Sequence, residues 1–167
     1  MLPMSEKPYN VLFLCTGNSA RSIMAEVMLN HLGDGRLKAY SAGSHPKGTV
    51  HPLAIATMQD TGLPVDGPRS KSWEEFARPD APPIDFILTV CDDAAGEVCP
   101  IWPGKPITAH WGVEDPAAFT GTEDEQRKKF HAIALLLRQR IERLLSLPLA
   151  TLDAATIQAQ LKEIGQE

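Results

Sequence analysis

Short runs of consecutive apolar residues alternate along this chain with stretches in which apolar residues recur at every third or fourth position. Residues 11–14 form a continuous apolar run, which is typical of a strand buried on both faces, as in a parallel sheet, and the mostly apolar residues 84–90 are the clearest remaining buried strand. Residues 37–41 and Ile107–His110 are shorter segments that we also interpret as strands. The pattern therefore predicts four short strands.

Helical spacing accounts for most of the rest of the chain. Thr122 and Glu125 form a capping-box pair at the start of the longest helical stretch, and Pro148 ends it. Residues 62–83 carry five prolines and are predicted as loop, with a turn at 72–76. The predicted helices cover residues 20–32, residues 52–61, the stretch between Thr122 and Pro148, and residues 153–164. Because strands and helices alternate, we expect an α/β domain with a parallel sheet, covering helices and right-handed crossovers.

Charge and composition narrow the classes of partner. The net charge of −5 argues against a nucleic-acid partner, because the chain has no general basic field to hold a polyphosphate, but a small anion in one local pocket remains open. No apolar run approaches the roughly 18 residues of a membrane span, and the first ten residues lack a signal-peptide pattern. The three cysteines, an odd number, favour reduced thiols in the cytoplasm over a structural disulfide set.

The sharpest chemical feature lies where the first predicted strand ends and the first predicted helix begins. A turn there aims several backbone N–H groups into one concavity, and the helix N-terminus adds positive potential, so a tetrahedral oxyanion fits. Arg21 supplies a forked donor for oxyanion oxygens, and the pKa of Cys15 should be lowered beside these groups, favouring the thiolate. The predicted oxyanion-binding residues are Thr16, Gly17, Asn18, Ser19, Ala20, Arg21 and Ser22.

Three residues within this loop have more specific expected roles. Gly17 lets the backbone approach an anion closely, and Asn18 tolerates left-handed geometry and can brace the loop through its amide. Ser22 could donate a hydrogen bond to the thiolate. The alternative is that Cys15 is a small buried residue and Arg21 a surface charge, but the strand before them and the helix after them favour the functional interpretation.

Residues 11–26, VLFLCTGNSARSIMAE, resemble the phosphate-binding loop of the low-molecular-weight tyrosine phosphatase superfamily, and more closely that of the arsenate reductases that share its fold. The likeness continues through residues 40–43, 89–91, 99–100 and 110–117. It implies a four-stranded parallel sheet of order 2-1-3-4 flanked by helices, in a domain of residues 1–147 followed by a C-terminal helical extension, residues 148–167. Phosphatases usually carry a second cysteine at the place of Ala20 and an aromatic residue at the place of Ala117, and both departures count against a phosphotyrosine phosphatase.

In this context Asp115 is the expected general acid, which protonates the leaving oxygen when the thiolate attacks. An Asp-Pro pair is also common in turns, which is the alternative interpretation of Asp115 and Pro116.

Cys91 and Cys99 are residues that a phosphatase does not need. The implied strand order puts Cys91 at the same sheet edge as Cys15, within disulfide reach after a small loop shift. If residues 92–98 were helical, the Cα atoms of Cys91 and Cys99 would lie roughly 12 Å apart, at about 1.5 Å per residue. A Cys91–Cys99 disulfide would then require that segment to unwind, which suggests a redox-driven switch; two ordinary loop cysteines are the alternative.

The expected function is therefore reduction of arsenate to arsenite in arsenic detoxification, through a Cys15–arsenic adduct and a disulfide relay of Cys15, Cys91 and Cys99. The expected reductant is an external thiol protein, thioredoxin, with glutaredoxin and glutathione or mycothiol as alternatives, and no tightly bound cofactor or metal is expected. The resemblance also implies a monovalent cation near Asn18, Glu26 and Ser41, although Lys71 stands where a further acidic ligand is expected. Two rival functions stay open at this point: a low-molecular-weight phosphatase that hydrolyses phosphomonoesters, and a noncatalytic redox or oxyanion sensor.

Overall fold

The computed structural model describes residues 8–166 except 34, 66, 92–103 and 105. Its four strands form one parallel sheet in the order β2-β1-β3-β4, which confirms the predicted fold class. The strands are β1 (Tyr9–Cys15), β2 (Leu37–Gly43), β3 (Phe86–Thr89) and β4 (Ile107–His110). The third strand is shorter than predicted, because its ladder with β1 runs only from Phe86 to Thr89.

The described helices fall where the apolar spacing predicts them. The α-helices are α1 (Arg21–Leu32), α2 (Pro52–Asp60), α4 (Glu123–Leu145) and α5 (Ala154–Gly165). Three short 3₁₀ turns are η1 (Trp73–Phe76), η2 (Pro116–Ala118) and η3 (Leu149–Thr151). The capping box of Thr122 and Glu125 is present at the start of α4, with both reciprocal hydrogen bonds formed.

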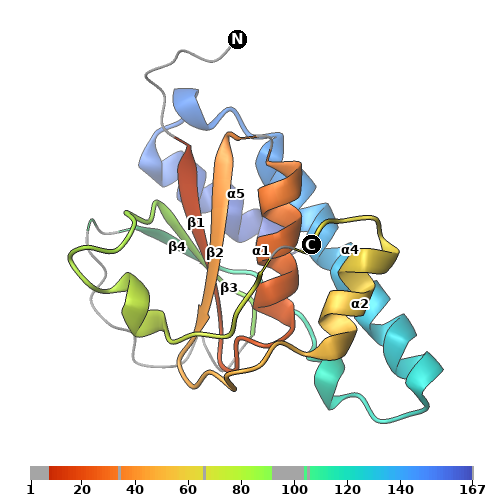
Figure 1. Cartoon of the computed structure of the whole chain (residues 1–167). Coiled ribbons are helices and arrows are strands. Elements are labelled where there is room, and N and C mark those ends of the chain that lie inside the picture. Colours follow the sequence, from red (N-terminus) through yellow and green to blue (C-terminus); the bar gives the residue numbers. More distant parts are fainter. Residues whose placement is uncertain (1–7, 34, 66, 92–103, 105, 167) are drawn as a thin grey trace.

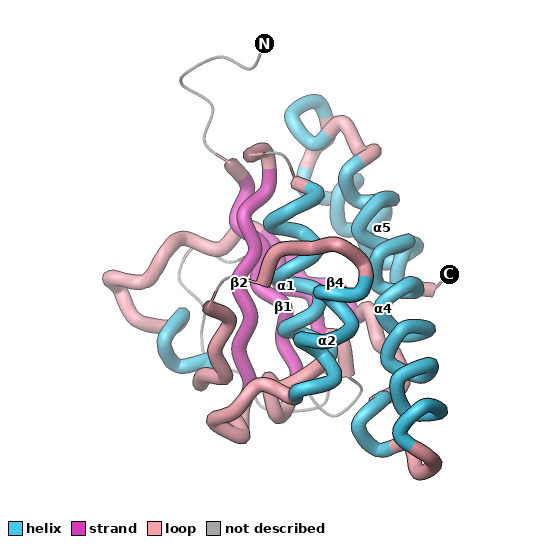
Figure 2. The backbone as a smooth tube through the Cα atoms, turned by 45° about the vertical axis from the view of Figure 1, so that its right-hand side comes forward, coloured by secondary structure: helices cyan, strands magenta, loops and turns pink. Residues whose placement is uncertain are grey.

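The alternation of side chains along β1 divides the core into two layers. Val11 and Phe13 face a large cluster that includes buried residues of α1, α4 and α5, while Leu12 and Leu14 face a smaller cluster with η1. Figures 1 and 2 accordingly show α1, α2, α4 and α5 gathered on one side of the sheet, with η1 and its loop on the other. Both faces of the central strand are therefore buried, as its continuous apolar run predicts.

The carboxyl ends of the strands lie along one edge of the sheet, at the lower end of Figure 1. Cys15 pairs in register with Gly43, Leu14 with Thr89, and Thr89 with His110. Open α/β sheets bind ligands at this edge, beside the point where the strand order reverses. Here that point lies next to β1, so the topology itself puts Cys15 at the expected position.

The last helix, α5, covers the β4 edge of the sheet on the same side as α1 and α4. It packs on β4, and the Trp111 indole N–H donates to the Leu161 carbonyl at 2.9 Å. The boundary that we place at residue 147 stays a prediction. Within the described residues, no helix is long and apolar enough to cross a membrane.

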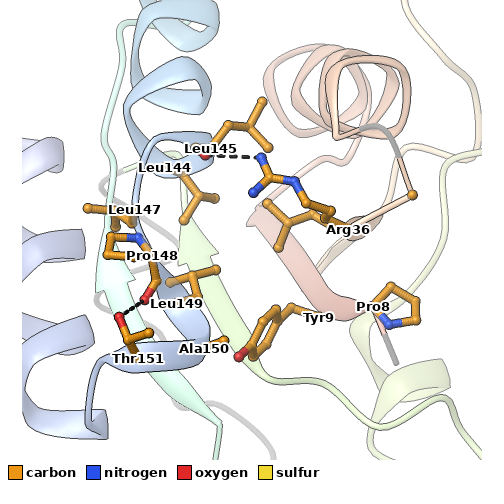
Figure 3. A pocket seen from close by; sticks show the side chains of 12 residues that line it. Pro8, Tyr9, Arg36, Leu144, Leu145, Leu147, Pro148, Leu149, Ala150 and Thr151 are labelled. Carbon is orange, nitrogen blue, oxygen red and sulfur yellow. Dashed lines mark hydrogen bonds between the residues drawn. The ribbon is translucent and has the colours of Figure 1, made fainter. Parts of the chain in front are cut away.

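An apolar hollow of about 190 Å³ lies at the other end of β1, between Tyr9 and the turn after α4 (Figure 3). Arg36 borders it, but its guanidinium donates to the Leu145 carbonyl at 3.1 Å. A strand of seven residues separates this hollow from Cys15, a distance of about 20 Å at roughly 3.3 Å per residue. It is therefore remote from the loop that carries the candidate chemistry.

Candidate active site

The loop after β1 encloses a hollow of about 190 Å³ at the carboxyl edge of the sheet. Five of the seven predicted oxyanion-binding residues line it together with Cys15 and Asp115. The complete lining is Cys15, Thr16, Gly17, Ser19, Ala20, Arg21, His45, Lys47 and Asp115. No side chain caps the start of α1 and no acidic residue stands in its first turn, so the positive end of the helix faces this hollow without a competing anion from its own residues.

Asn18 and Ser22 do not line the hollow but brace the loop from behind. Asn18 is fully buried and has a φ of 44°, the only positive φ of a non-glycine residue in the described part of the chain. Its side-chain oxygen accepts from the Lys71 backbone N–H at 2.9 Å, and its amide donates to Ser22 Oγ at 2.8 Å. The bracing predicted for Asn18 is present, whereas the described contact of the Ser22 hydroxyl is with Asn18 rather than with Cys15.

Glycine at the end of β2 lets that strand run close beneath the loop. A Cβ at Gly43 would collide with the carbonyl oxygens of Thr16 and Cys15. Gly43 also donates its N–H to the Lys71 carbonyl at 2.9 Å. The floor of the loop is thus held by backbone contacts that a side chain would prevent.

Arg21 is fixed so that part of its guanidinium faces the hollow. Nη1 donates to the Val113 carbonyl at 3.0 Å, and Nη2 lies 3.7 Å from Asp115 Oδ2. The Nε–H is buried and, among the described residues, has no hydrogen-bond partner. A buried donor without an acceptor is costly, so this N–H is a polar group that the described residues leave unsatisfied.

Asp115 is held beside Arg21 at the rim of the hollow. Its Oδ1 accepts from the Ala117 N–H at 3.0 Å, because Asp115 caps the 3₁₀ turn η2. The side chain is 38% exposed and lines the hollow, so its carboxylate is accessible both from solvent and from the hollow. The turn role and the general-acid role, which the sequence presents as alternatives, are compatible in this geometry.

Cys91 lies against the same loop from the neighbouring strand. Its sulfur accepts from the Thr16 backbone N–H at 3.3 Å and lies 3.5 Å from Thr16 Oγ1. Both Cys15 and Cys91 are buried thiols that are not joined in a disulfide. The structure therefore brings these two predicted cysteines together, while Cys99 and the predicted unwinding segment, residues 92–98, lie outside the described residues.

The pKa of Cys15 is shifted in the direction opposite to the one that the loop alone predicts. The neighbouring Cys91 raises the pKa of the Cys15 thiol, and burial raises it further. The Arg21 guanidinium and the Gly17 N–H act in the expected direction but do not outweigh them. The positive groups of the loop can be predicted from the sequence, whereas the second sulfur is brought close to Cys15 only by the fold.

Replacing Cys91 should consequently lower the pKa of Cys15. In Cys91→Ala the largest raising influence is gone and Arg21 remains, so the thiolate should form at lower pH than in the wild type. Titration of thiolate absorbance, with iodoacetamide alkylation of Cys15 followed against pH, measures this. Cys99→Ala is the matched control and should leave the alkylation profile of Cys15 in place; an unchanged profile in Cys91→Ala would contradict the coupling.

His45 and Lys47 also line the hollow, although the sequence pattern does not single them out. The segment after β2 is hydrogen-bonded along the loop, with the N–H groups of His45 and Lys47 donating to Thr16 and Gly17 at 2.9 and 3.0 Å. A Cβ at Gly17 would lie 3.2 Å from the Lys47 stem, so glycine lets this lysine lie across the loop. Their position just past a strand end at the ligand-binding edge is the signal that could have revealed them.

Lys47 also affects the electrostatics of the next helix. Burial and the Lys47 ammonium lower the pKa of His51, which caps α2, while Asp115 opposes them. Lys47, Arg21 and the N-terminus of α1 together surround the hollow with positive potential. That is the field a small doubly charged oxyanion requires, although the whole chain is acidic.

The suggested monovalent cation site does not fit a resident metal. Lys71 Nζ lies 3.8 Å from Glu26 Oε1, and the Ser41 hydroxyl donates to the same carboxylate oxygen. Asn18 Oδ1 already accepts from the Lys71 N–H. Burial raises the pKa of Glu26 and lowers that of Lys71, and each charge opposes the shift of the other. Among the residues that the structure describes, no group of three or more His, Cys, Asp or Glu could hold a metal ion.

A parallel α/β sheet with a cysteine and an arginine in the loop between its first strand and first helix is the arrangement expected of a protein that binds oxyanions beside a thiol. The chain belongs to the family described as low molecular weight phosphotyrosine protein phosphatase, which it matches over residues 10–162.

Relatives within this family are named arsenate reductases. The chain is 38% identical to an arsenate reductase of Bacillus licheniformis over 142 residues, which are 84% of this chain and 96% of that protein. It is 30% identical to a glutaredoxin arsenate reductase of Synechocystis over 81% of this chain and 95% of the relative. A solved arsenate reductase in its phosphate-binding state is 30% identical and superimposes with a TM-score of 0.66, covering 83% of this chain and 97% of the other.

Proposed function

We propose that this protein reduces arsenate to arsenite. The observation that carries the proposal is the sulfur of Cys91 at 3.3 Å from the Thr16 N–H, in the same loop that begins with Cys15. A hydrolase needs one thiol at this place, whereas a reductase needs a second thiol to take up the oxidising equivalents. The names of the relatives support the same choice.

The first step is a nucleophilic substitution at arsenic. The loop N–H groups and Arg21 bind arsenate, and the Cys15 thiolate attacks the arsenic atom. An As–S bond forms and an As–O bond breaks. Asp115 gives its proton to the departing oxygen, which leaves as water, and the site holds a Cys15–arsenic(V) adduct.

The second step transfers two electrons. The Cys91 thiolate attacks the sulfur of Cys15, an S–S bond forms, and the electron pair of the S–As bond goes to arsenic. Arsenic(V) becomes arsenic(III), which leaves as arsenite, and the two thiols are oxidised to a Cys15–Cys91 disulfide. Cys99 then attacks Cys91, which frees Cys15 and moves the disulfide to Cys91 and Cys99.

An external dithiol must return the electrons. We propose thioredoxin, because three cysteines can carry the disulfide from the shielded loop to a position that a protein thiol can attack. The name of the Synechocystis relative favours glutaredoxin instead, so the two systems are compared in the test. The relay needs a compartment that keeps thiols reduced, and the cytoplasm is one.

Two alternative functions share parts of this site. A phosphatase would use Cys15, Arg21 and Asp115 but would leave Cys91 without a role. A sensor that only reports oxidation would need no general acid, and Asp115 placed 3.7 Å from Arg21 argues against it.

The deciding experiment measures arsenate-dependent NADPH oxidation with thioredoxin and thioredoxin reductase, and in parallel with glutaredoxin and glutathione. Hydrolysis of p-nitrophenyl phosphate is measured on the same preparation. We expect catalytic arsenite production with one thiol system and only slow ester hydrolysis. Efficient hydrolysis without arsenate turnover in any thiol system would assign the protein to the phosphatases.

A further inference from the structure

A buried lysine lies directly behind the loop, outside the hollow that Cys15 and Arg21 line. Lys71 is 8% exposed, and its ammonium lies 3.8 Å from Glu26 Oε1 and donates to the Arg69 carbonyl at 3.0 Å. The hydroxyl of fully buried Ser41 donates to the same Glu26 oxygen. The carboxylate and the ammonium thus compensate each other, and removal of either leaves a buried charge uncompensated.

The backbone of the same lysine holds the loop. Its N–H donates to Asn18 Oδ1 at 2.9 Å, and Asn18 in turn donates to Ser22 Oγ at 2.8 Å. Asn18 has a left-handed backbone, which non-glycine residues keep only when their surroundings enforce it. A displacement of Lys71 would therefore reach Asn18 directly, and through it the N–H groups that surround the oxyanion.

The charges already beside Glu26 decide which cation can lie against its carboxylate. The Glu26 carboxylate can be neutralised by an ammonium of the chain or by a monovalent ion from solution. With Lys71 Nζ already beside it, a metal ion at the same oxygens would face a like charge at close range in a poorly solvated site. The oxygens of Glu26, Ser41 and Asn18 that the resemblance assigns to a cation are engaged by Lys71 or by one another.

We propose that the Lys71 ammonium is the built-in cation of this site, which replaces a monovalent metal ion and keeps the oxyanion loop in its binding shape without potassium. Lys71 is a positioning residue, because it acts through Glu26 and Asn18. The proposal deepens the proposed function by naming what holds the loop, and it requires only that the loop bind an oxyanion.

Binding of inorganic phosphate, measured by calorimetry in potassium chloride and in choline chloride of equal ionic strength, tests the proposal. The wild type should bind phosphate equally well in both salts. Lys71→Met should bind roughly 10-fold more weakly in choline chloride, the usual effect of removing a supporting shell. Potassium should restore phosphate binding, because the uncompensated carboxylate of Glu26 then accepts the ion.

Three further variants separate charge from structure. Lys71→Arg keeps the cation and should stay independent of potassium. Glu26→Gln combined with Lys71→Met removes both charges and should also be insensitive to potassium, since no anion remains to bind it. Lys128→Gln, a lysine change on an exposed side chain, is the matched surface control.

Two results would overturn the proposal: a wild type that needs potassium to bind phosphate, or a Lys71→Met protein with equal affinity in both salts. If Lys71→Met does not fold, the wild type and the neutral double variant decide, and potassium dependence in either one counts against the proposal. Phosphate binding involves no reduction of arsenate. Failure of the proposed function would thus be seen in the turnover assay and not in this one.

Discussion

Cys15→Ser should abolish arsenate reduction and any hydrolysis of p-nitrophenyl phosphate together, by roughly 10⁴–10⁶-fold, because both reactions begin with the same thiolate attack. A serine hydroxyl is a much weaker nucleophile than a cysteine thiolate unless a neighbouring base removes its proton, and no such base is assigned in this site. Phosphate binding should survive, since the loop N–H groups and Arg21 supply it. Turnover in both assays, together with phosphate calorimetry, gives the three readouts. Substantial reductase turnover in Cys15→Ser would remove Cys15 from the mechanism.

Two other variants separate loss of the nucleophile from loss of oxyanion binding or of acid catalysis. Arg21→Lys should be nearly as damaging and should also weaken phosphate binding, because a point charge cannot replace the guanidinium that contacts Val113 and faces the hollow. Asp115→Asn should still bind phosphate, but the Cys15–arsenic adduct should form roughly 10²–10⁴-fold more slowly. Single-turnover kinetics at saturating arsenate distinguish these effects.

Cys91→Ser should stop the release of arsenite while phosphate-ester hydrolysis continues. Serine cannot attack the sulfur of Cys15 to form a disulfide, so the arsenic adduct has no route to reduction. Hydrolysis uses water in its second step and does not involve Cys91. Arsenate reductase activity should fall to the detection limit. The measurement is the ratio of reductase activity to phosphatase activity. Equal losses of both activities would indicate that Cys91 supports the loop through Thr16 rather than taking part in the chemistry.

Cys99→Ser is the comparison that separates the two thiols. With thioredoxin it should complete about one turnover and then accumulate the Cys15–Cys91 disulfide, which mass mapping of the peptides detects, because that bond is shielded within the anion loop. With a small thiol such as glutathione or mycothiol, which can enter the loop, turnover should continue. Full turnover of Cys99→Ser with thioredoxin would contradict the three-cysteine relay.

The local elements and the loop could be predicted from the sequence because each depends on nearest neighbours. The apolar run before Cys15 places β1, and the spacing after it places α1, so a loop rich in N–H groups had to lie between them. Thr122 and Glu125 lie three residues apart and satisfy each other within one helical turn. The strand order came from the resemblance, since hydrophobic periodicity specifies which faces are buried but not which strands are neighbours.

Contacts between distant segments were decided only by the tertiary structure. Cys91 meets Thr16 across 75 positions of sequence, and the resulting rise in the pKa of Cys15 reverses the expectation drawn from the loop alone. Lys47 crosses Gly17, and Lys71 reaches Glu26 and Asn18, because the segments after β2 fold back along the loop. A side chain's pKa and partners depend on burial and on charges a few ångströms away, and folding brings those charges from anywhere in the chain. The sequence thus determined which chemistry is available at the end of β1, and the fold determined which groups surround it.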